Sequence, residues 1–265
     1  MRRFVRLMAI TVQGRMYYRA SFFLNLTTPL ILLAGQFLLW RSLYGAQAGG
    51  AIGSFAQADM FSYILLAFGI NNLLTWSSEN VLSREIRSGE VIARRIRPVP
   101  FLSQTMADMT GNLLIQAVVN GAAVVLAFVL FARWLTPPAP GMLVAFVPSL
   151  LLAILLRMML VHSFSLLCFF TTGHLGLTWT RQALTDFFSG ALIPVALFPA
   201  WLQSVTYVLP FPLMLQIPIA IFLGQPLPMP LWQTYALQVV WIFVFFGLHV
   251  VLYGYIRKNT TLAGG

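Results

Sequence analysis

Lysine is almost absent from this chain, because Lys258 is the only lysine among 265 residues and it follows Arg257. A phosphate-binding loop of the form GxxxxGKS or GxxxxGKT requires a glycine directly before a lysine. No such loop exists here, so the chain does not hydrolyse ATP by that route. We expect a protein that is not itself an enzyme and that holds no cofactor of its own.

Cysteine and histidine are too few and too scattered for a metal site. Cys168 is the only cysteine, so the chain can form neither an internal disulfide nor a thiolate metal cluster. His162, His174 and His249 have no second ligand at metal spacing, so the sequence predicts no metal site. Helix packing or loop polarity is the expected role of these histidines.

Acidic residues are scarce as well. All six lie at the ends of apolar runs or in one polar segment: Asp59, Glu79, Glu85, Glu90, Asp108 and Asp186. Proton-driven transport usually places carboxylates within the membrane, so this pattern disfavours it, although Asp108 and Asp186 keep that alternative open.

The overall composition excludes an ordinary water-soluble surface. Only 8% of residues are charged and 59% are hydrophobic, which is typical of an integral membrane protein. The net charge of +10 would suggest nucleic acid in a soluble protein, but arginines that flank apolar runs are typical of cytoplasmic loops. We therefore predict an all-α integral membrane protein with one domain over residues 1–265 and no nucleic-acid partner.

Uncharged runs of about 20 residues predict the membrane-spanning helices. We expect six spans: Ser21–Trp40, Met60–Ser78, Met109–Ala132, Gly141–Phe170, Gln182–Pro199 and Leu231–Tyr255. The uncharged stretch 187–256 contains eight prolines, and proline ends or kinks a helix. For residues 200–230 we therefore predict short re-entrant or surface helices outside the cytoplasm.

Arginine and lysine are distributed unevenly about these spans. Thirteen fall on one side and only Arg41 and Arg133 on the other, which places both termini in the cytoplasm by the positive-inside rule. Arg157 lies inside an apolar run, and we expect it to form a structural ion pair. Asp186 is expected to pair with Arg181 or Arg157.

Two segments outside the spans carry most of the charge. Residues 1–20 combine arginines with Phe4, Leu7, Met8 and Val12 near helical spacing, which favours an interfacial amphipathic helix; a short polar leader is the alternative. Residues 79–108 hold nine of the 22 charged side chains. This polar insert is predicted to face the cytoplasm.

Two parts of the sequence carry a family resemblance. The insert contains Glu85-Ile86-Arg87-Ser88-Gly89-Glu90 and continues through Arg94-Arg95-Ile96-Arg97-Pro98. The later segment contains Phe188-Ser189-Gly190, Ile193-Pro194, Phe198-Pro199, Leu209-Pro210-Phe211 and Pro218 through Gly224. These segments resemble the first cytoplasmic loop, and the region between spans five and six, of permease subunits from type-2 ABC exporters.

The resemblance implies a permease in the cytoplasmic (plasma) membrane. Its partners would be membrane lipid, a second permease copy, identical or related, and two cytosolic ATPase subunits that bind ATP and Mg. The resemblance also implies that the cargo moves outward. Few charges line the predicted spans, which favours a hydrophobic or amphiphilic cargo.

The insert offers a docking site that carries both positive and negative charges, which a soluble partner could recognise. Its candidate ATPase-coupling residues are Glu85, Arg87, Glu90, Arg94 and Arg95. Three alternatives stay open at this point: arginines that only fix topology, an ion-gradient transporter or channel without an ATPase, and a membrane scaffold that transports nothing.

Overall fold

The computed structural model describes residues 7–8, 19–46, 51–53, 55–74, 78–130, 141–171 and 174–259, and these are mostly helical. The helices are α2 (Arg19–Ala46), α3 (Gln57–Leu73), α4 (Ser78–Ser88), α5 (Val91–Ile96), α6 (Phe101–Leu130), α7 (Met142–Leu166), α8 (His174–Phe188), α9 (Ala200–Val208), α10 (Gln216–Leu223) and α11 (Leu231–Asn259). Three single 3-10 turns accompany them: η2 (Leu167–Phe169), η3 (Val195–Leu197) and η4 (Pro212–Met214). The predicted interfacial helix over residues 1–20 falls almost wholly outside the described residues.

One small hairpin interrupts the helical architecture. Strands β1 (Ala51–Ile52) and β2 (Phe55–Ala56) pair antiparallel, with Ala51 opposite Ala56. The Tyr44 hydroxyl at the end of α2 donates a 2.9 Å hydrogen bond to the Phe55 carbonyl oxygen. This bond fixes the hairpin against the helix that precedes it.

Long apolar helices occur where five of the spans were predicted. In the described chain, three helical stretches are long and apolar enough to cross a membrane, namely Gln57–Ser88, Met142–Phe169 and Leu231–Lys258; Leu30–Ala46 is a shorter apolar helix. The helix α6 overlaps the third predicted span. The helical class is therefore confirmed, whereas the count of six spans stays a prediction.

The bounds predicted for the fifth span, Gln182–Pro199, are wrong. The helix α8 has only 15 residues and ends at Phe188, short of the roughly 20 that a span needs. Gly190 follows with φ of 85°, and a Cβ there would lie 2.6 Å from the side-chain oxygens of Tyr63 and Gln216. The chain turns at this crowded position because glycine alone fits, and the helix cannot continue to Pro199.

The proline-rich segment 200–230 forms the predicted short helices. Within it, α10 is buried from Gln216 to Ile221, whereas α9 exposes Trp201 and Val205. One short helix thus lies inside the protein and the other at its surface. Their position relative to the lipid stays a prediction.

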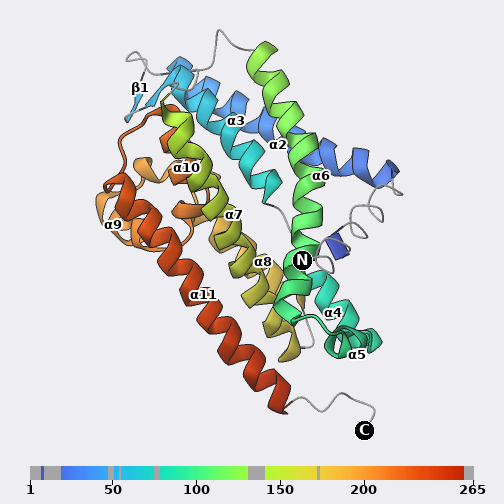
Figure 1. Ribbon diagram of the computed structural model, residues 1–265. Coiled ribbons are helices and arrows are strands. Elements are labelled where there is room, and N and C mark those ends of the chain that lie inside the picture. Colours follow the sequence, from blue (N-terminus) through green and yellow to red (C-terminus); the bar gives the residue numbers. More distant parts are fainter. Residues whose placement is uncertain are drawn as a thin grey trace.

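The two ends of the bundle differ in content (Figure 1). The hairpin, α9 and α10 lie at one end, and α4, α5 and the last turns of α11 lie at the other. The larger apolar core draws on α3, α7, η4 and α10. A smaller core joins one residue from each of five helices: Leu82, Val91, Phe101, Leu166 and Ile256.

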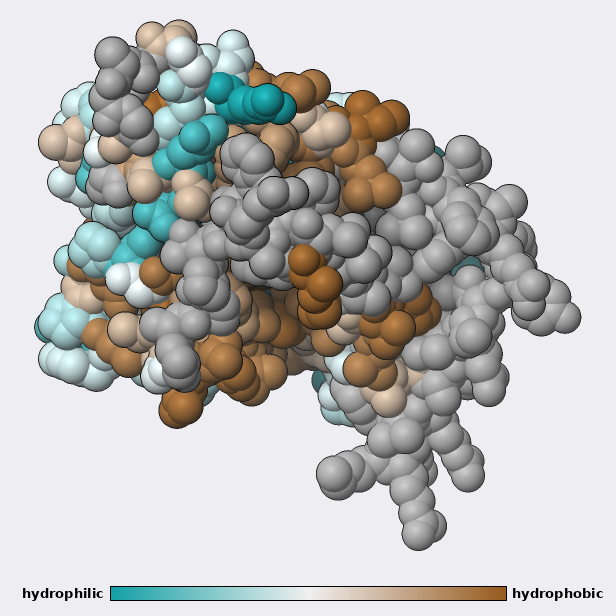
Figure 2. All heavy atoms as spheres, turned by 90° about the horizontal axis from the view of Figure 1, so that it is seen from above, coloured by the Kyte–Doolittle hydropathy of each residue, from teal (hydrophilic) through white to brown (hydrophobic). Residues whose placement is uncertain are grey.

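The long helices expose apolar side chains to their surroundings. Val144 of α7 is 79% exposed, and Ile31 of α2 and Val251 of α11 are also exposed. Seen from above, the molecule shows broad brown patches of hydrophobic residues on its visible sides (Figure 2). Such surfaces suit contact with lipid rather than water.

Candidate functional site

The part of the polar insert that precedes α6 folds as two short helices, α4 and α5, joined at Gly89. Its φ of 78° lies in the left-handed region that favours glycine. On the inner side of this unit, Leu82 of α4 and Val91 of α5 are buried and belong to the smaller core. The turn therefore lets both helices bury one face and expose the other.

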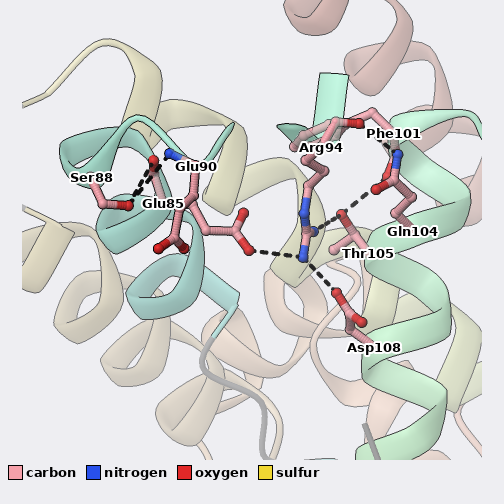
Figure 3. Close-up of polar contacts among 8 residues, drawn as sticks. All are labelled: Glu85, Ser88, Glu90, Arg94, Phe101, Gln104, Thr105 and Asp108. Carbon is pink, nitrogen blue, oxygen red and sulfur yellow. Dashed lines mark hydrogen bonds and ion pairs between the residues drawn. The ribbon is translucent and has the colours of Figure 1, made fainter. Parts of the chain in front are cut away.

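Arg94 ties the insert to the first turns of α6 (Figure 3). Its Nη2 atom lies 3.1 Å from Glu85 Oε1 and 2.7 Å from Asp108 Oδ2. Its Nη1 atom lies 3.5 Å from the Thr105 hydroxyl oxygen. One cation from α5 thus sits between a carboxylate of α4 and a carboxylate of α6.

A second group of contacts holds the same turn. The Gln104 amide nitrogen donates to the backbone carbonyls of Arg94 and Val99 at 2.8 and 2.9 Å. The Arg94 guanidinium carbon also lies 5.8 Å from the centre of the Phe101 ring, within range of a cation–π interaction. The end of α5 is therefore fixed through both its backbone and its side chain.

The five predicted coupling residues divide into two groups. Glu85 and Arg94 face each other inside the insert and form an ion pair whose side chains are mostly buried. Arg87 and Glu90 are exposed, and Arg95 is half-buried. Only some of the five candidate residues are therefore exposed, and their coupling role stays a prediction.

Two exposed apolar residues of the insert were missed by the sequence reasoning. Ile92 and Ile96 lie four positions apart on α5 and are 41% and 78% exposed. Their spacing on one helix face was the available signal. We call these two residues and the exposed Arg87 and Glu90 the docking face.

Burial changes the acidity of the anchoring carboxylate. Desolvation raises the pKa of Glu85 above its ordinary value, and the Arg94 guanidinium opposes this shift. The nearby carboxylates of Asp108 and Glu90 raise the pKa of Glu85 further. Burial outweighs the ion pair here.

A buried ion pair joins the insert to α8. The Arg181 Nε atom donates to Glu79 Oε1, and both side chains are almost wholly buried. The Cys168 thiol also lies 3.7 Å from the Glu79 carbonyl oxygen. The predicted pairing of Asp186 with Arg181 or Arg157 is not what the structure shows, since Asp186 accepts hydrogen bonds from Gln182 on its own helix.

Arg157 departs from its predicted role. Arg157 is only 2% exposed. Within the described ranges it nevertheless forms no ion pair, and its Nε atom has no hydrogen-bond partner. Its electrostatic neighbours are Arg181, Asp186 and Glu79. The four side chains carry two positive and two negative charges, so the cluster balances without a direct contact to Arg157.

Two histidines that are far apart in the sequence meet in the bundle. His162 Nε2 of α7 lies 2.8 Å from His249 Nδ1 of α11. In the described ranges no three or more histidine, cysteine or acidic residues are grouped to hold a metal ion. The pair packs two long helices together, which is the role expected from the sequence.

A comparison with protein families identifies the chain. The model described as ABC-2 family transporter protein matches residues 30–258. The chain belongs to the ABC-2 transporter family. No curated protein matches it. The match to the family model confirms the family resemblance seen in the sequence. ABC-2 permeases are membrane transport components that are not themselves catalytic and that generally work with an ATPase subunit.

Proposed function

We propose that this ABC-2 permease passes a hydrophobic or amphiphilic substrate outward, driven by ATP hydrolysis in separate cytosolic subunits that dock on α4 and α5. The observation that carries this proposal is the docking face. Arg87, Glu90, Ile92 and Ile96 are exposed on a unit whose inner side is fixed by Arg94. A rigid element that offers charged and apolar contacts to a soluble partner can pass a movement of that partner on to the helices that pack against it.

The route from the docking face into the bundle is short. The helix α4 packs against α7 and α8, and Glu79 on its first turn binds Arg181 of α8. A displacement of the insert would therefore reach both of these helices at once. We further propose that a second permease, identical or related, completes the unit by covering exposed apolar surface on helices such as α11.

The docking face is tested by reversing its charges. We expect Arg87→Glu combined with Glu90→Arg to leave the permease in the membrane and to reduce the co-purifying ATPase at least about tenfold, because two complementary contacts become repulsive. The matched control is Arg41→Glu, an exposed arginine near the hairpin end, which should retain the ATPase. Equal retention by both variants would refute the docking assignment.

An ion-gradient transporter remains the second candidate, favoured by one observation. Glu79 is fully buried beside Arg157, Arg181 and Asp186, and buried ionisable groups often mark ion pathways. That candidate predicts substrate flux in liposomes from this chain alone, driven by a pH gradient and abolished by Glu79→Gln. ATP-dependent flux that requires the ATPase excludes it.

A further inference from the structure

A small cavity of about 50 Å³ lies between α9, α10, η3 and the hairpin. These elements are at the end of the bundle opposite the insert (Figure 1). A space of roughly 10–15 Å³ holds one water molecule, so the cavity admits a group of a few non-hydrogen atoms. Its position separates it from the docking face and from the proposed ATPase contact.

The Gln216 side chain of α10 has an unused donor at this cavity. Its Oε1 atom accepts hydrogen bonds from the Val195 backbone N–H at 3.2 Å and from the Tyr63 hydroxyl at 2.5 Å. A backbone N–H can only donate, so the amide oxygen must lie on that side and the amide nitrogen on the other.

The amide nitrogen of Gln216 reaches accessible surface although the residue is only 3% exposed. Its Nε2 atom bonds no group of the described chain. Nor is it among the unpaired side-chain atoms that are shut off from solvent. Because Gln216 lines the cavity, its two N–H groups have surface there from which to donate.

Two further side chains bring polar groups to the same wall. The Tyr207 hydroxyl of α9 and the Gln225 amide after α10 form no hydrogen bond within the described residues, and neither is shut off from solvent. The rest of the described wall is mostly apolar, and it includes the Phe55 ring of β2. A few convergent polar groups on an apolar wall are typical of a ligand site.

The wall offers no charge to a ligand. Only uncharged side chains line the described part of it. A phosphate, carboxylate or ammonium group in the cavity would leave water without gaining a counter-charge, which is costly. The N–H donors of Gln216 instead suit a neutral oxygen acceptor. The cavity therefore favours an uncharged group that carries a hydroxyl or carbonyl oxygen.

An apolar helix face begins beside the cavity. Trp201, Val205 and Val208 of α9 are all exposed, and their spacing of four and then three residues places them on one face of the helix. We call these three residues the α9 face. Val208 directly follows Tyr207, whose side chain lines the cavity. A molecule with its polar head in the cavity can thus lay an apolar chain along the α9 face.

We propose that this cavity receives the uncharged, hydroxyl-bearing head of the amphiphile that the permease transports, with the alkyl chain lying along the α9 face. Gln216 Nε2 donates to an oxygen of the head. The Tyr207 hydroxyl and the Gln225 amide complete the hydrogen bonds of the head. This inference rests on the proposed function and narrows the cargo to amphiphiles without charge.

The test uses the full-length permease in detergent micelles, without any ATPase. Three probes with matched alkyl chains are added singly, and their retention is measured by native mass spectrometry. The probes are 1-oleoylglycerol, which is uncharged, oleoyl lysophosphatidic acid, which is anionic, and oleylamine, which is cationic. We expect 1-oleoylglycerol to be retained at least about tenfold better than either charged probe, because a charged head would be desolvated without a partner. Equal retention of the three, or no retention of 1-oleoylglycerol, overturns the proposal without any variant.

A single hydroxyl then locates the bound head. Tyr207→Phe removes one hydrogen-bonding group from the wall and should reduce retention of 1-oleoylglycerol about three- to tenfold. The matched control Tyr255→Phe alters an exposed tyrosine at the other end of the bundle and should leave retention unchanged. Equal losses from the two variants would mean that the probe binds the general surface, which contradicts a built site.

The donor is tested by Gln216→Glu. This variant keeps an oxygen for the Val195 N–H but replaces the amide nitrogen by a second carboxylate oxygen. At pH 9 it should retain oleylamine better than 1-oleoylglycerol, which reverses the order seen with the unaltered protein. An unreversed order in a variant that keeps the unaltered thermal unfolding midpoint contradicts the proposal.

Competition decides whether the alkyl chain belongs to the ligand. Glycerol shares the hydroxyl groups of 1-oleoylglycerol but lacks the chain, so it should displace that probe only weakly. Displacement at equal concentration would show a site for a soluble polyol and would overturn the amphiphile assignment.

Transport assays with the ATPase distinguish failure of this inference from failure of the proposed function. ATP-driven export of a charged amphiphile by a permease that does not retain 1-oleoylglycerol would refute this inference alone. Retention that depends on Tyr207, without any ATP-driven flux, would leave the binding site standing and refute the proposed function.

Discussion

The two ends of the bundle stabilise their buried polar groups by opposite means. The charged end consists of α4, α5 and the parts of α6 and α8 that contact them. Its links are ion pairs, between Glu79 and Arg181 and between Arg94 and two carboxylates. The amide end consists of η3, α9, η4, α10 and the parts of α3, α7 and α11 that contact them, and its links are neutral.

Glutamine side chains hold the amide end together. Gln216 Oε1 accepts hydrogen bonds from the Val195 backbone N–H at 3.2 Å and from the Tyr63 hydroxyl at 2.5 Å. The Gln238 amide nitrogen donates to the Leu213 carbonyl oxygen at 2.9 Å. These bonds reach backbone groups that prolines and short helices leave without helical partners.

The difference follows from what each end must do. Broken apolar backbone needs donors and acceptors of no net charge, because charge is costly in a dry interior. At the charged end the buried Glu79 carboxylate is paired with Arg181, and this pairing offsets the cost of burying either charge. The comparison makes the charged end the more sensitive to loss of a single partner, and four measurements test this.

The largest effect is expected at the buried ion pair. Replacing Arg181→Met leaves the Glu79 carboxylate buried without its cation, which should cost about 3–5 kcal/mol of folding free energy. The free energy is measured by reversible SDS titration in mixed micelles. The double variant Glu79→Leu with Arg181→Met should recover most of the loss, because the buried anion and the buried cation of the pair are removed together. A single variant that costs no more than the double would break the comparison.

A smaller effect is expected at the amide end. Gln216→Leu leaves the buried Val195 N–H without its acceptor, which should cost about 1–3 kcal/mol in the same titration. The Tyr63 hydroxyl keeps the Gly190 carbonyl oxygen as an acceptor at 2.7 Å. The control is Gln203→Leu. Its amide binds two backbone carbonyls, but the side chain is only half-buried, so water can replace it. A Gln216 variant as costly as the Arg181 variant would show that both ends are equally sensitive.

The anchor of the insert should give a still smaller and more local change. Arg94→Gln releases α5 from Glu85 and Asp108 and should cost roughly 1–2 kcal/mol, since the pairs are partly exposed. Amide hydrogen exchange should accelerate over residues 91–96 and stay unchanged over residues 216–223. Arg97→Gln, which removes an exposed arginine, serves as the control. Faster exchange at both ends would mean that the insert is not a separate unit.

The smallest effect concerns pH. The pKa of Glu85 is raised in the folded protein, so folding favours the protonated acid and the associated stability is complete below the unfolded pKa. That stability is lost as pH rises from near the ordinary glutamate value of about 4.3 through the raised pKa. Thermal unfolding midpoints should therefore fall slightly over this window. The dependence should be weaker in Glu85→Gln, and an unchanged dependence would assign it to other groups.

Prediction from sequence succeeded where one residue type or one long pattern decides the matter. The insert was found because charge is concentrated in residues 79–108, and the broken segment 200–230 because proline cannot continue a helix. It failed at the fifth span, whose end depends on Gly190 packing against Tyr63 and Gln216. Nothing in the local sequence around Gly190 indicates those neighbours.

The sequence by itself determined the membrane class, the absence of a phosphate-binding loop and the place of the charged insert, because composition and residue order are sufficient for each. Only the tertiary structure decided which charges meet. Arg181 and Glu79 are 102 positions apart, and Asp186, much nearer to Arg181 in the chain, binds elsewhere. Pairing in a bundle is set by the helix faces that pack together, and sequence separation carries no information about that contact.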